Sequence, residues 1–348
     1  MDLPNTMSGI VLTGHGGPDC LQWRDDLPVP QPGRSDVIVR VRAAAVNNTD
    51  INTRIGWYSK NDNDAADASW GGTPLHLPRI QGADVCGEIV ATGGDIDGRR
   101  LGERVILEPC LREAEGRQPA LPWYLGSECD GGFAQYVRIA SRHAHAVVSD
   151  LSDVALASFP CSYSTAENML TRAAIGPEDT VLVTGASGGV GSAAVQLARA
   201  RGARVVAVTS PAKADALKAL GTDSTLARDE DTVAVLGANS VDAVIDLVGG
   251  PAWPRLLEVL RPGGRYAVSG AIAGPIVPLD LRTLYLKDLS FFGCTVLDPQ
   301  VFGALVGRIE RGEIKPLVAA TYPLRDIAAA QAAFQEKGHV GKIVLTID

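Results

Sequence analysis

The stretch TVLVTGASGGVG, residues 180–191, decides the fold of this 348-residue chain. It begins with an apolar, β-branched run that is typical of a buried strand and ends in a glycine-rich turn. An apolar helix is expected directly after the turn, over residues 191–200. This order of strand, turn and helix predicts a dinucleotide fingerprint, in which backbone N–H groups and the helix N-terminus hold a pyrophosphate.

The sequence around this stretch alternates between strands and helices from about residue 152. Strands are expected over residues 181–184, 204–209, 241–247, 265–269 and 289–294, and helices over 191–200, 212–220 and 252–260. The alternation predicts an α/β fold with a doubly wound parallel sheet of the Rossmann type. Two further helices, about 299–311 and 324–337, and a closing strand over 342–345 follow.

The first 150 residues are instead β-rich. Short strand-like runs over 37–43, 87–91 and 104–107 lie between Gly, Pro and Asp residues. Two loops, 59–77 and 111–127, look inserted. Three tryptophans lie in or beside these loops: Trp57, Trp70 and Trp123. They either pack the loops against the rest of the protein or line the entrance of an apolar substrate site.

Composition narrows the class of partner. The chain is 46% hydrophobic and carries 21% charged residues, which excludes a disordered chain. Its formal net charge of −8 argues against nucleic acid or an anionic membrane as a partner and favours a small molecule. No signal peptide or transmembrane span is evident, and the six cysteines form no C-x-x-C pair, so a reducing cytoplasm is expected.

The end of the second Rossmann strand indicates the choice of cofactor. An enzyme that uses NAD places an acidic residue there to hold the ribose 2′-hydroxyl. This chain has Thr209, Ser210 and Lys213 instead, and Arg228 follows the next expected strand. A hydroxyl and two cations suit a 2′-phosphate, so NADPH is predicted. The alternative is that Lys213 and Arg228 are solvated surface charges.

The chain resembles the medium-chain dehydrogenase/reductase superfamily, and within it the zinc-independent quinone oxidoreductase-like branch. The resemblance spans nearly the whole length, through motifs at residues 33–43, 47–58, 82–90, 131–136, 165–166, 184–191, 246–250, 292–293 and 341–345. It implies a GroES-like catalytic domain, residues 1–152 and 298–348, interrupted by a Rossmann domain, residues 153–297. The active site is expected in the cleft between them. It also implies a homodimer joined at the apolar edge strand 289–294.

The same resemblance raises the question of a metal. Zinc members bind the catalytic ion at positions that match Asn47, Ala83 and Cys161 here. An amide and a methyl group cannot replace a thiolate and an imidazole around tetrahedral zinc. The lobe for a structural zinc offers only Cys110 and Cys129. No zinc is therefore predicted.

The resemblance also implies which residues contact the cofactor. Thr165 would face the nicotinamide ribose or amide, and Lys342 would close over the cofactor. The turn would hold the pyrophosphate through Ala186, Ser187, Gly188, Gly189 and Val190. The adenosine phosphate would be held by Ser210, Lys213 and Arg228. The nicotinamide side would be lined by Val248, Gly270, Ala271 and Ile272, and its carboxamide would meet backbone groups of Phe292, Gly293 and Cys294.

Without a Lewis acid, oxidation of a simple alcohol is disfavoured. The predicted reaction is hydride transfer from NADPH to a quinone or an α,β-unsaturated carbonyl, an electrophile expected to be apolar or aromatic. Candidate hydrogen-bond donors to the acceptor are Asn47, Thr49 and Tyr58. Asp50 and Arg54 are expected to form a structural ion pair. Two alternatives remain: a carbonyl reductase or alcohol dehydrogenase with the same cofactor, and a protein that binds NADPH without turnover.

Overall fold

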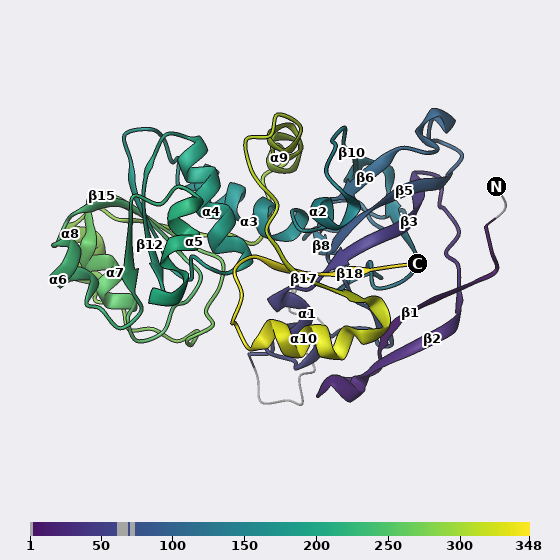
Figure 1. Cartoon of the computed structure of the whole chain (residues 1–348), viewed down its shortest axis with the longest axis horizontal. Coiled ribbons are helices and arrows are strands. Elements are labelled where there is room, and N and C mark those ends of the chain that lie inside the picture. The colour runs from purple at the N-terminus through teal and green to yellow at the C-terminus, as the bar shows by residue number, and fades with distance from the viewer. Residues whose placement is uncertain (1–2, 61–68, 70–73) are drawn as a thin grey trace. The chain divides into compact units, whose positions relative to one another are not determined.

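The structure is a computed structural model that describes residues 3–60, 69 and 74–348. The chain forms two compact units. Unit 1 comprises residues 1–161, 316–338 and 342–348, and unit 2 comprises 162–315 and 339–341. Figure 1 traces both from the purple N-terminus to the yellow C-terminus. Trp70 and most of the first predicted loop lie outside the described residues.

Unit 1 is built on β-sheets, as the β-rich N-terminal sequence predicts. Its largest sheet has the order β10-β6-β5-β3-β18-β17, and β9 also pairs with β3. The strands are β3 (Asp36–Ala45), β5 (Asp84–Thr92), β6 (Arg104–Leu107), β9 (Tyr136–Ala140), β10 (Ala144–Ala146), β17 (Val318–Pro323) and β18 (Lys342–Thr346). One edge of β3 is shared, because its first half pairs with β9 and its last three residues pair with β18.

Smaller elements complete unit 1. A three-stranded sheet has the order β2-β1-β4, and β7 pairs with β8. Their bounds are β1 (Thr6–Leu12), β2 (Leu21–Pro28), β4 (Arg79–Ile80), β7 (Cys110–Leu111) and β8 (Trp123–Tyr124). The helices are α1 (Asn48–Arg54), α2 (Asp153–Ala157) and α10 (Ile327–Gln335), and Figure 1 shows α10 alongside β17 and β18. The predicted loop 111–127 therefore contains most of a short hairpin, and Tyr124 is buried within it.

Unit 2 contains the predicted parallel sheet, in the order β13-β12-β11-β14-β15-β16. The strands are β11 (Thr180–Val183), β12 (Arg204–Thr209), β13 (Ser224–Ala227), β14 (Val241–Asp246), β15 (Leu260–Val268) and β16 (Ser290–Gly293). Every pairing among them is parallel. The chain order reverses between β11 and β14, which is the switch point where doubly wound sheets bind ligands.

The helices of unit 2 lie before, between and after these strands in the chain. They are α3 (Pro160–Arg172), α4 (Gly189–Ala200), α5 (Ala214–Ala219), α6 (Thr232–Leu236), α7 (Trp253–Val259), α8 (Leu281–Leu286) and α9 (Val301–Glu310). Helix α4 lies beside β12 (Figure 1), and its small and apolar residues are buried. No described helix is both long enough and apolar enough to cross a membrane.

The sequence analysis places residues 298–348 in the catalytic domain, but the first part of this segment, with α9, belongs to unit 2. The Arg308 guanidinium on α9 lies 3.5 Å from the carboxylate of Glu167 on α3. The apolar face of α9, including Phe302 and Leu305, is buried. These contacts attach the helix to the Rossmann-type unit, so the chain returns to unit 1 only near residue 316.

Candidate functional site

The predicted cofactor residues of unit 2 gather at one edge of its sheet. The carboxyl ends of parallel strands share an edge, so the loops that follow them become neighbours. The fingerprint follows β11, and Ser210 and Lys213 follow β12. The other members follow the ends of β13, β14, β15 and β16: Arg228, Val248, Gly270, Ala271, Ile272 and Cys294.

The glycines of the fingerprint allow a tight turn into α4. Gly185 has φ +57°, a left-handed conformation that favours glycine. A Cβ atom on Gly191 would lie 2.3 Å from the Gly185 carbonyl oxygen, so only glycine fits there. Because the first N–H groups of a helix lack intrahelical partners, those of Gly189 and Val190 remain to bind an anion. Gly188 is exposed at the same turn.

The structure changes the role of Ala186. Its side chain is fully buried, and its N–H donates to the Val208 carbonyl at 3.2 Å. Ala186 thus supports the turn and has no free N–H for a pyrophosphate. Ser187 is also buried, and its carbonyl accepts a bond from the N–H of Gly341.

Asp246 anchors the loop at the switch point, a role that the sequence analysis missed. Its carboxylate is completely buried and accepts hydrogen bonds from the Thr184 hydroxyl at 2.6 Å and the Tyr266 hydroxyl at 2.6 Å. It also accepts from the N–H groups of Val248 and Gly249. One carboxylate therefore ties β11, β15 and the loop after β14 together, and this fixes the backbone around Val248.

Two cations lie near each other beyond β12 and β13. Lys213 is partly buried and donates to the His339 carbonyl at 2.8 Å. Burial and the charge of Arg228 lower the pKa of Lys213. The Arg228 side chain is exposed, and the described residues form no ion pair with it. Mutual repulsion between two cations favours an anion beside them.

The remaining predicted cofactor residues differ in accessibility. Thr165 on α3 is 9% exposed, Ile272 is 63% exposed, and Phe292 is half-buried. The N–H of Cys294 is not available to a carboxamide, because it donates to the Val268 carbonyl at 2.9 Å. Its carbonyl accepts from the Ser269 hydroxyl at 2.7 Å, so the backbone polar groups of Cys294 already have partners.

Unit 1 contains a buried ionic cluster at the end of β3. The Lys342 ammonium lies 2.8 Å from the Asp84 carboxylate, and the two side chains are 2% and 0% exposed. The ammonium also donates to the Asn47 side-chain oxygen. The Asn47 amide nitrogen donates to Asp84 at 2.9 Å and to the Ala45 carbonyl at 3.3 Å. The N–H of Cys161 donates to the other oxygen of Asp84.

This cluster corrects two sequence predictions. Lys342 does not close over a cofactor, because its ammonium is buried against Asp84 and Asn47. Asn47 is not a free donor to a substrate, because both of its amide hydrogens and its oxygen have partners. Lys and Asp are rarely buried, so a sequence gives little reason to expect them in a core. Asp84 and Lys342 are 258 positions apart, and no local pattern indicates that they pair.

Asp50 lies beside the cluster and carries a perturbed carboxyl group. Burial raises its pKa to about 7, although the Asn47 N–H and the Lys342 charge act in the opposite direction. The Asn47 N–H donates to Asp50 at 2.7 Å. The expected ion pair between Asp50 and Arg54 is absent among the described residues. The Arg54 guanidinium instead donates to the Gln331 side chain at 3.0 Å and to the Gly16 carbonyl at 2.6 Å.

Two of the three candidate catalytic residues are brought together in unit 1. The Tyr58 hydroxyl is hydrogen-bonded with Thr49 and Asn52 at α1. Burial raises the pKa of Tyr58, so the phenol stays protonated at neutral pH. The Trp57 ring meets the Tyr58 ring edge-on at 5.4 Å, and Trp57 is 40% exposed. A protonated hydroxyl beside a second hydroxyl is able to donate to a negatively charged oxygen.

Together, the fingerprint turn at the switch point of a Rossmann sheet and the separate β-rich unit define an oxidoreductase that uses a nicotinamide dinucleotide. The chain belongs to the medium-chain dehydrogenase/reductase superfamily. Residues 33–149 match the family described as "Alcohol dehydrogenase GroES-like domain", and residues 189–311 match the one described as "Zinc-binding dehydrogenase". Both matches agree with the fold.

Similar proteins carry several names. An acryloyl-coenzyme A reductase from Metallosphaera sedula is 30% identical over 98% of this chain and 100% of its own length. The quinone oxidoreductase of Homo sapiens is 27% identical over 98% of each chain. A solved structure from Sinorhizobium meliloti 1021, provisionally designated an alcohol dehydrogenase, is 45% identical, with a TM-score of 0.92 over 99% of this chain and 98% of that one.

One of these family descriptions implies zinc, and the residues present do not fit it. Asn47 and Ala83 offer neither thiolate nor imidazole, and a buried ammonium lies against Asn47. No group of three or more His, Cys, Asp or Glu side chains in the described part of the chain is placed to hold a metal ion. A cation among these groups would repel the Lys342 ammonium.

Proposed function

We propose that this chain transfers a hydride from NADPH to a quinone or an α,β-unsaturated carbonyl compound without zinc. The observation that carries the proposal is the set of groups that replaces the zinc ligands, in which Asn47 and Lys342 complete a cluster around Asp84. Conversion of an alcohol into an alkoxide at neutral pH calls for a Lewis acid. Acceptors that are already electron-poor need only orientation, exclusion of water and one hydrogen bond.

In this proposal unit 2 binds the cofactor, which supplies the hydride. The N–H groups of Gly189 and Val190 bind the pyrophosphate at the N-terminus of α4. Asp246 holds the loop around Val248 in place for the nicotinamide side. Lys213 and Arg228 bind the 2′-phosphate, whose negative charge offsets the burial and the repulsion from Arg228 that lower the pKa of Lys213.

Unit 1 supplies the hydrogen bond to the acceptor. The Tyr58 hydroxyl donates to the oxygen on which negative charge develops, and Thr49 orients that hydroxyl. Asn47 does not donate, because its amide is held by Asp84 and the Ala45 carbonyl. Among the similar proteins, acryloyl-coenzyme A reductase bears the name of an acceptor with a C=C bond conjugated to a carbonyl, which supports this acceptor class.

Alcohol dehydrogenation or carbonyl reduction is the second candidate, favoured by the 45% identity to the Sinorhizobium meliloti protein. It uses the same cofactor residues and requires Thr49 and Tyr58 to polarise a ketone or aldehyde. Binding of NADPH without turnover is the third. Cofactor oxidation distinguishes these, because a protein that only binds changes the cofactor fluorescence and leaves NADPH unoxidised.

The test is a metal assay and an oxidation screen on the purified full chain. NADPH and NADH are offered with a quinone, an enone and an aldehyde at matched concentrations. We expect turnover with the quinone or the enone, a preference for NADPH, and substoichiometric zinc. Stoichiometric zinc with alcohol oxidation would overturn the proposal, as would an equal use of NADH.

Two variants test the cofactor assignment. Lys213→Ala should raise KM for NADPH by about tenfold or more and leave KM for NADH unchanged, because the 2′-phosphate is the one cofactor group that this cation binds in the proposal. Lys218→Ala is the matched control, since that ammonium is exposed and pairs with Asp215. Equal effects of the two substitutions would contradict the assignment.

We also propose a homodimer joined through β16. This strand is at the edge of the sheet, and its Phe291 is 37% exposed. Leu286 and Tyr285 on the preceding helix are 71% and 61% exposed. An unpaired edge beside apolar side chains favours association with a second copy. Sedimentation at micromolar concentration should give a dimer, and a monomer would refute this part.

A further inference from the structure

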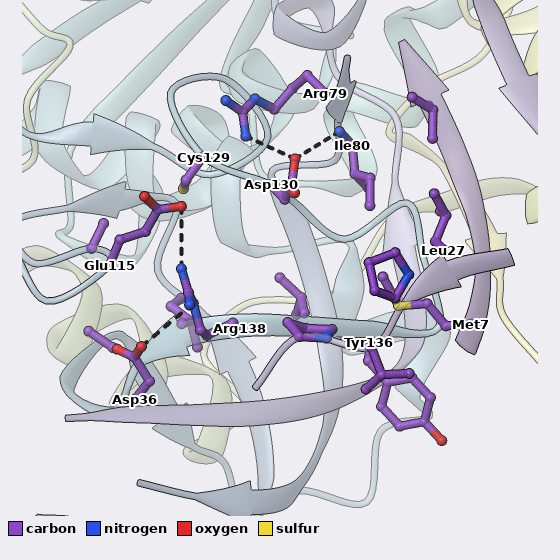
Figure 2. Close-up of a pocket in the computed structure, with 18 of the residues that line it drawn as sticks. Met7, Leu27, Asp36, Arg79, Ile80, Glu115, Cys129, Asp130, Tyr136 and Arg138 are labelled. Atoms are coloured by element: carbon purple, nitrogen blue, oxygen red, sulfur yellow. Dashed lines mark hydrogen bonds and ion pairs between the residues drawn. The ribbon is translucent and has the colours of Figure 1, made fainter. Parts of the chain in front are cut away.

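A cavity of ≈ 330 Å³ is lined by residues of unit 1 alone. It is lined by β1, β2, β4 and β9 and by residues near both ends of the segment 111–130 (Figure 2). Its volume is at the lower end of the about 300–1,000 Å³ that small-molecule sites occupy. Neither Thr49 nor Tyr58 lines it, so it is a separate feature from the proposed acceptor site.

Much of the wall is apolar. Met7, Leu27 and Ile80 lie on one side in Figure 2, and Val137 and Ile139 of β9 also line the cavity. Each of these side chains except Leu27 is buried. A wall of this kind accepts an apolar body of a few carbon atoms, and its burial there is favourable.

The polar groups of the cavity leave one negative charge in excess. Arg79 and Asp130 form a pair at 2.9 Å, which is neutral. Arg138 lies 3.6 Å from Asp36 and 3.4 Å from Glu115, so one guanidinium faces two carboxylates (Figure 2). A net negative site favours a cation over an anion.

Asp36 also has an incomplete set of hydrogen bonds. Its side chain is 2% exposed, and one oxygen accepts the Gly33 N–H at 3.1 Å. The other oxygen is buried and has no hydrogen-bond partner among the described residues. A buried carboxylate oxygen without a donor costs free energy, which a donor on a ligand would recover.

We propose that this cavity binds a small apolar molecule with one protonated amine. The ammonium lies beside Asp36, where it donates to the unpartnered Asp36 oxygen, and together with the Arg138 guanidinium it offsets the charges of Asp36 and Glu115. The apolar body lies against Met7, Ile80 and Val137. The site goes beyond the proposed oxidoreductase function and does not depend on it.

Three probes with the same six-carbon chain test the chemistry: n-hexylamine, n-hexanol and hexanoate, each titrated calorimetrically into the full chain. We expect saturable binding of one hexylamine per chain, with an affinity at least about tenfold above those of the alcohol and the carboxylate. Hexanol binding as tightly as hexylamine would overturn the proposal, because the cavity would then select only for apolar bulk. Tighter binding of hexanoate would also overturn it.

Variants locate the binding. Asp36→Asn with Glu115→Gln changes the charge of the cavity from −1 to +1 and should reverse the preference, so that hexanoate binds better than hexylamine. Glu336→Gln, an exposed acid outside the cavity, is the matched control and should retain the original preference. Unchanged hexylamine affinity in the double variant would refute the site. Leu27→Trp, which fills the cavity, should abolish binding of all three probes; retained binding would place the ligand elsewhere.

Discussion

The Lys342–Asp84 ion pair gives the sharpest test of the buried cluster. Asp84→Asn keeps the shape of the side chain and an acceptor for the Cys161 N–H, and removes the charge together with the oxygen that accepts from Lys342 and Asn47. The Lys342 ammonium, 2% exposed, then lies in the protein interior without its counter-ion. Lys342→Met removes the cation and leaves the carboxylate of Asp84 buried instead.

The expected cost follows from this burial. Removing one partner of a buried pair costs about 3–5 kcal/mol, because the other charge stays desolvated. For a unit of this size each kcal/mol lowers Tm by about 2–4 °C, so either variant should lose about 6–20 °C. The double variant Asp84→Asn/Lys342→Met contains no unpaired charge, so it should cost about 1–3 kcal/mol less than the sum of the two singles.

Calorimetry and urea unfolding at constant pH measure these losses. Asp95→Asn is the control, since its partner Arg34 is 85% exposed and the pair should contribute no more than about 1 kcal/mol. A loss for Asp84→Asn no larger than that of the control would refute the buried pair. A raised Kd for NADPH in Lys342→Met with an unchanged Tm would instead restore the cofactor role that the sequence predicted for Lys342.

Three further predictions concern separate residues. Burial raises the pKa of Asp50 from 3.8 to about 7, so its neutral form stabilises the fold fully below about pH 4, and this contribution is lost as pH rises to about 7. As the pH rises across that window, the free energy of unfolding of Asp50→Asn should therefore increase relative to that of the wild type, by up to about 4 kcal/mol measured by urea unfolding. A difference between the two proteins that does not change with pH would contradict the raised pKa. Gly191→Ala places a Cβ atom 2.3 Å from the Gly185 oxygen, so it should weaken NADPH binding by about tenfold or more in a fluorescence titration. Gly303→Ala is the control, because its Cβ atom meets no neighbouring atom and NADPH binding should not change. His143 accepts the N–H groups of Arg112 and Glu113 at 3.1 and 3.2 Å and lies 2.7 Å from Glu108, so His143→Ala should cost about 2–4 kcal/mol of unfolding free energy, against almost none for the exposed His76→Ala.

Sequence patterns predict unit 2 well because its information is local. The strand, glycine turn and helix of residues 180–200 are adjacent in the chain, and each parallel strand ends where a loop begins. The positions of Ser210, Arg228 and Val248 at one edge follow from that rule alone. Helix α9 was misassigned because its ion pair with Glu167 spans more than a hundred positions.

The ionic cluster of unit 1 was not predictable in the same way. Lys342 stands beside Gly341 in a motif that looks like a cofactor contact, and nothing local shows that its side chain turns toward β5. The pairing of β18 with β3 brings residue 342 close to Asn47 and Asp84. Sheet register decides which charges meet, and register is a long-range property.

The completeness of this cluster bears directly on the chemistry. Each polar atom of the Asn47 side chain has a partner, and Asp84 accepts from Lys342, Asn47 and Cys161. A substrate oxygen that displaced one of these bonds would leave a buried charge less well compensated, which costs more than one hydrogen bond returns. The cluster therefore has a structural role at the N-terminus of α1, where it holds Asn47 in place. Of the three candidate catalytic residues, Thr49 and Tyr58, whose hydroxyls share a hydrogen bond, remain as candidates to bind the acceptor.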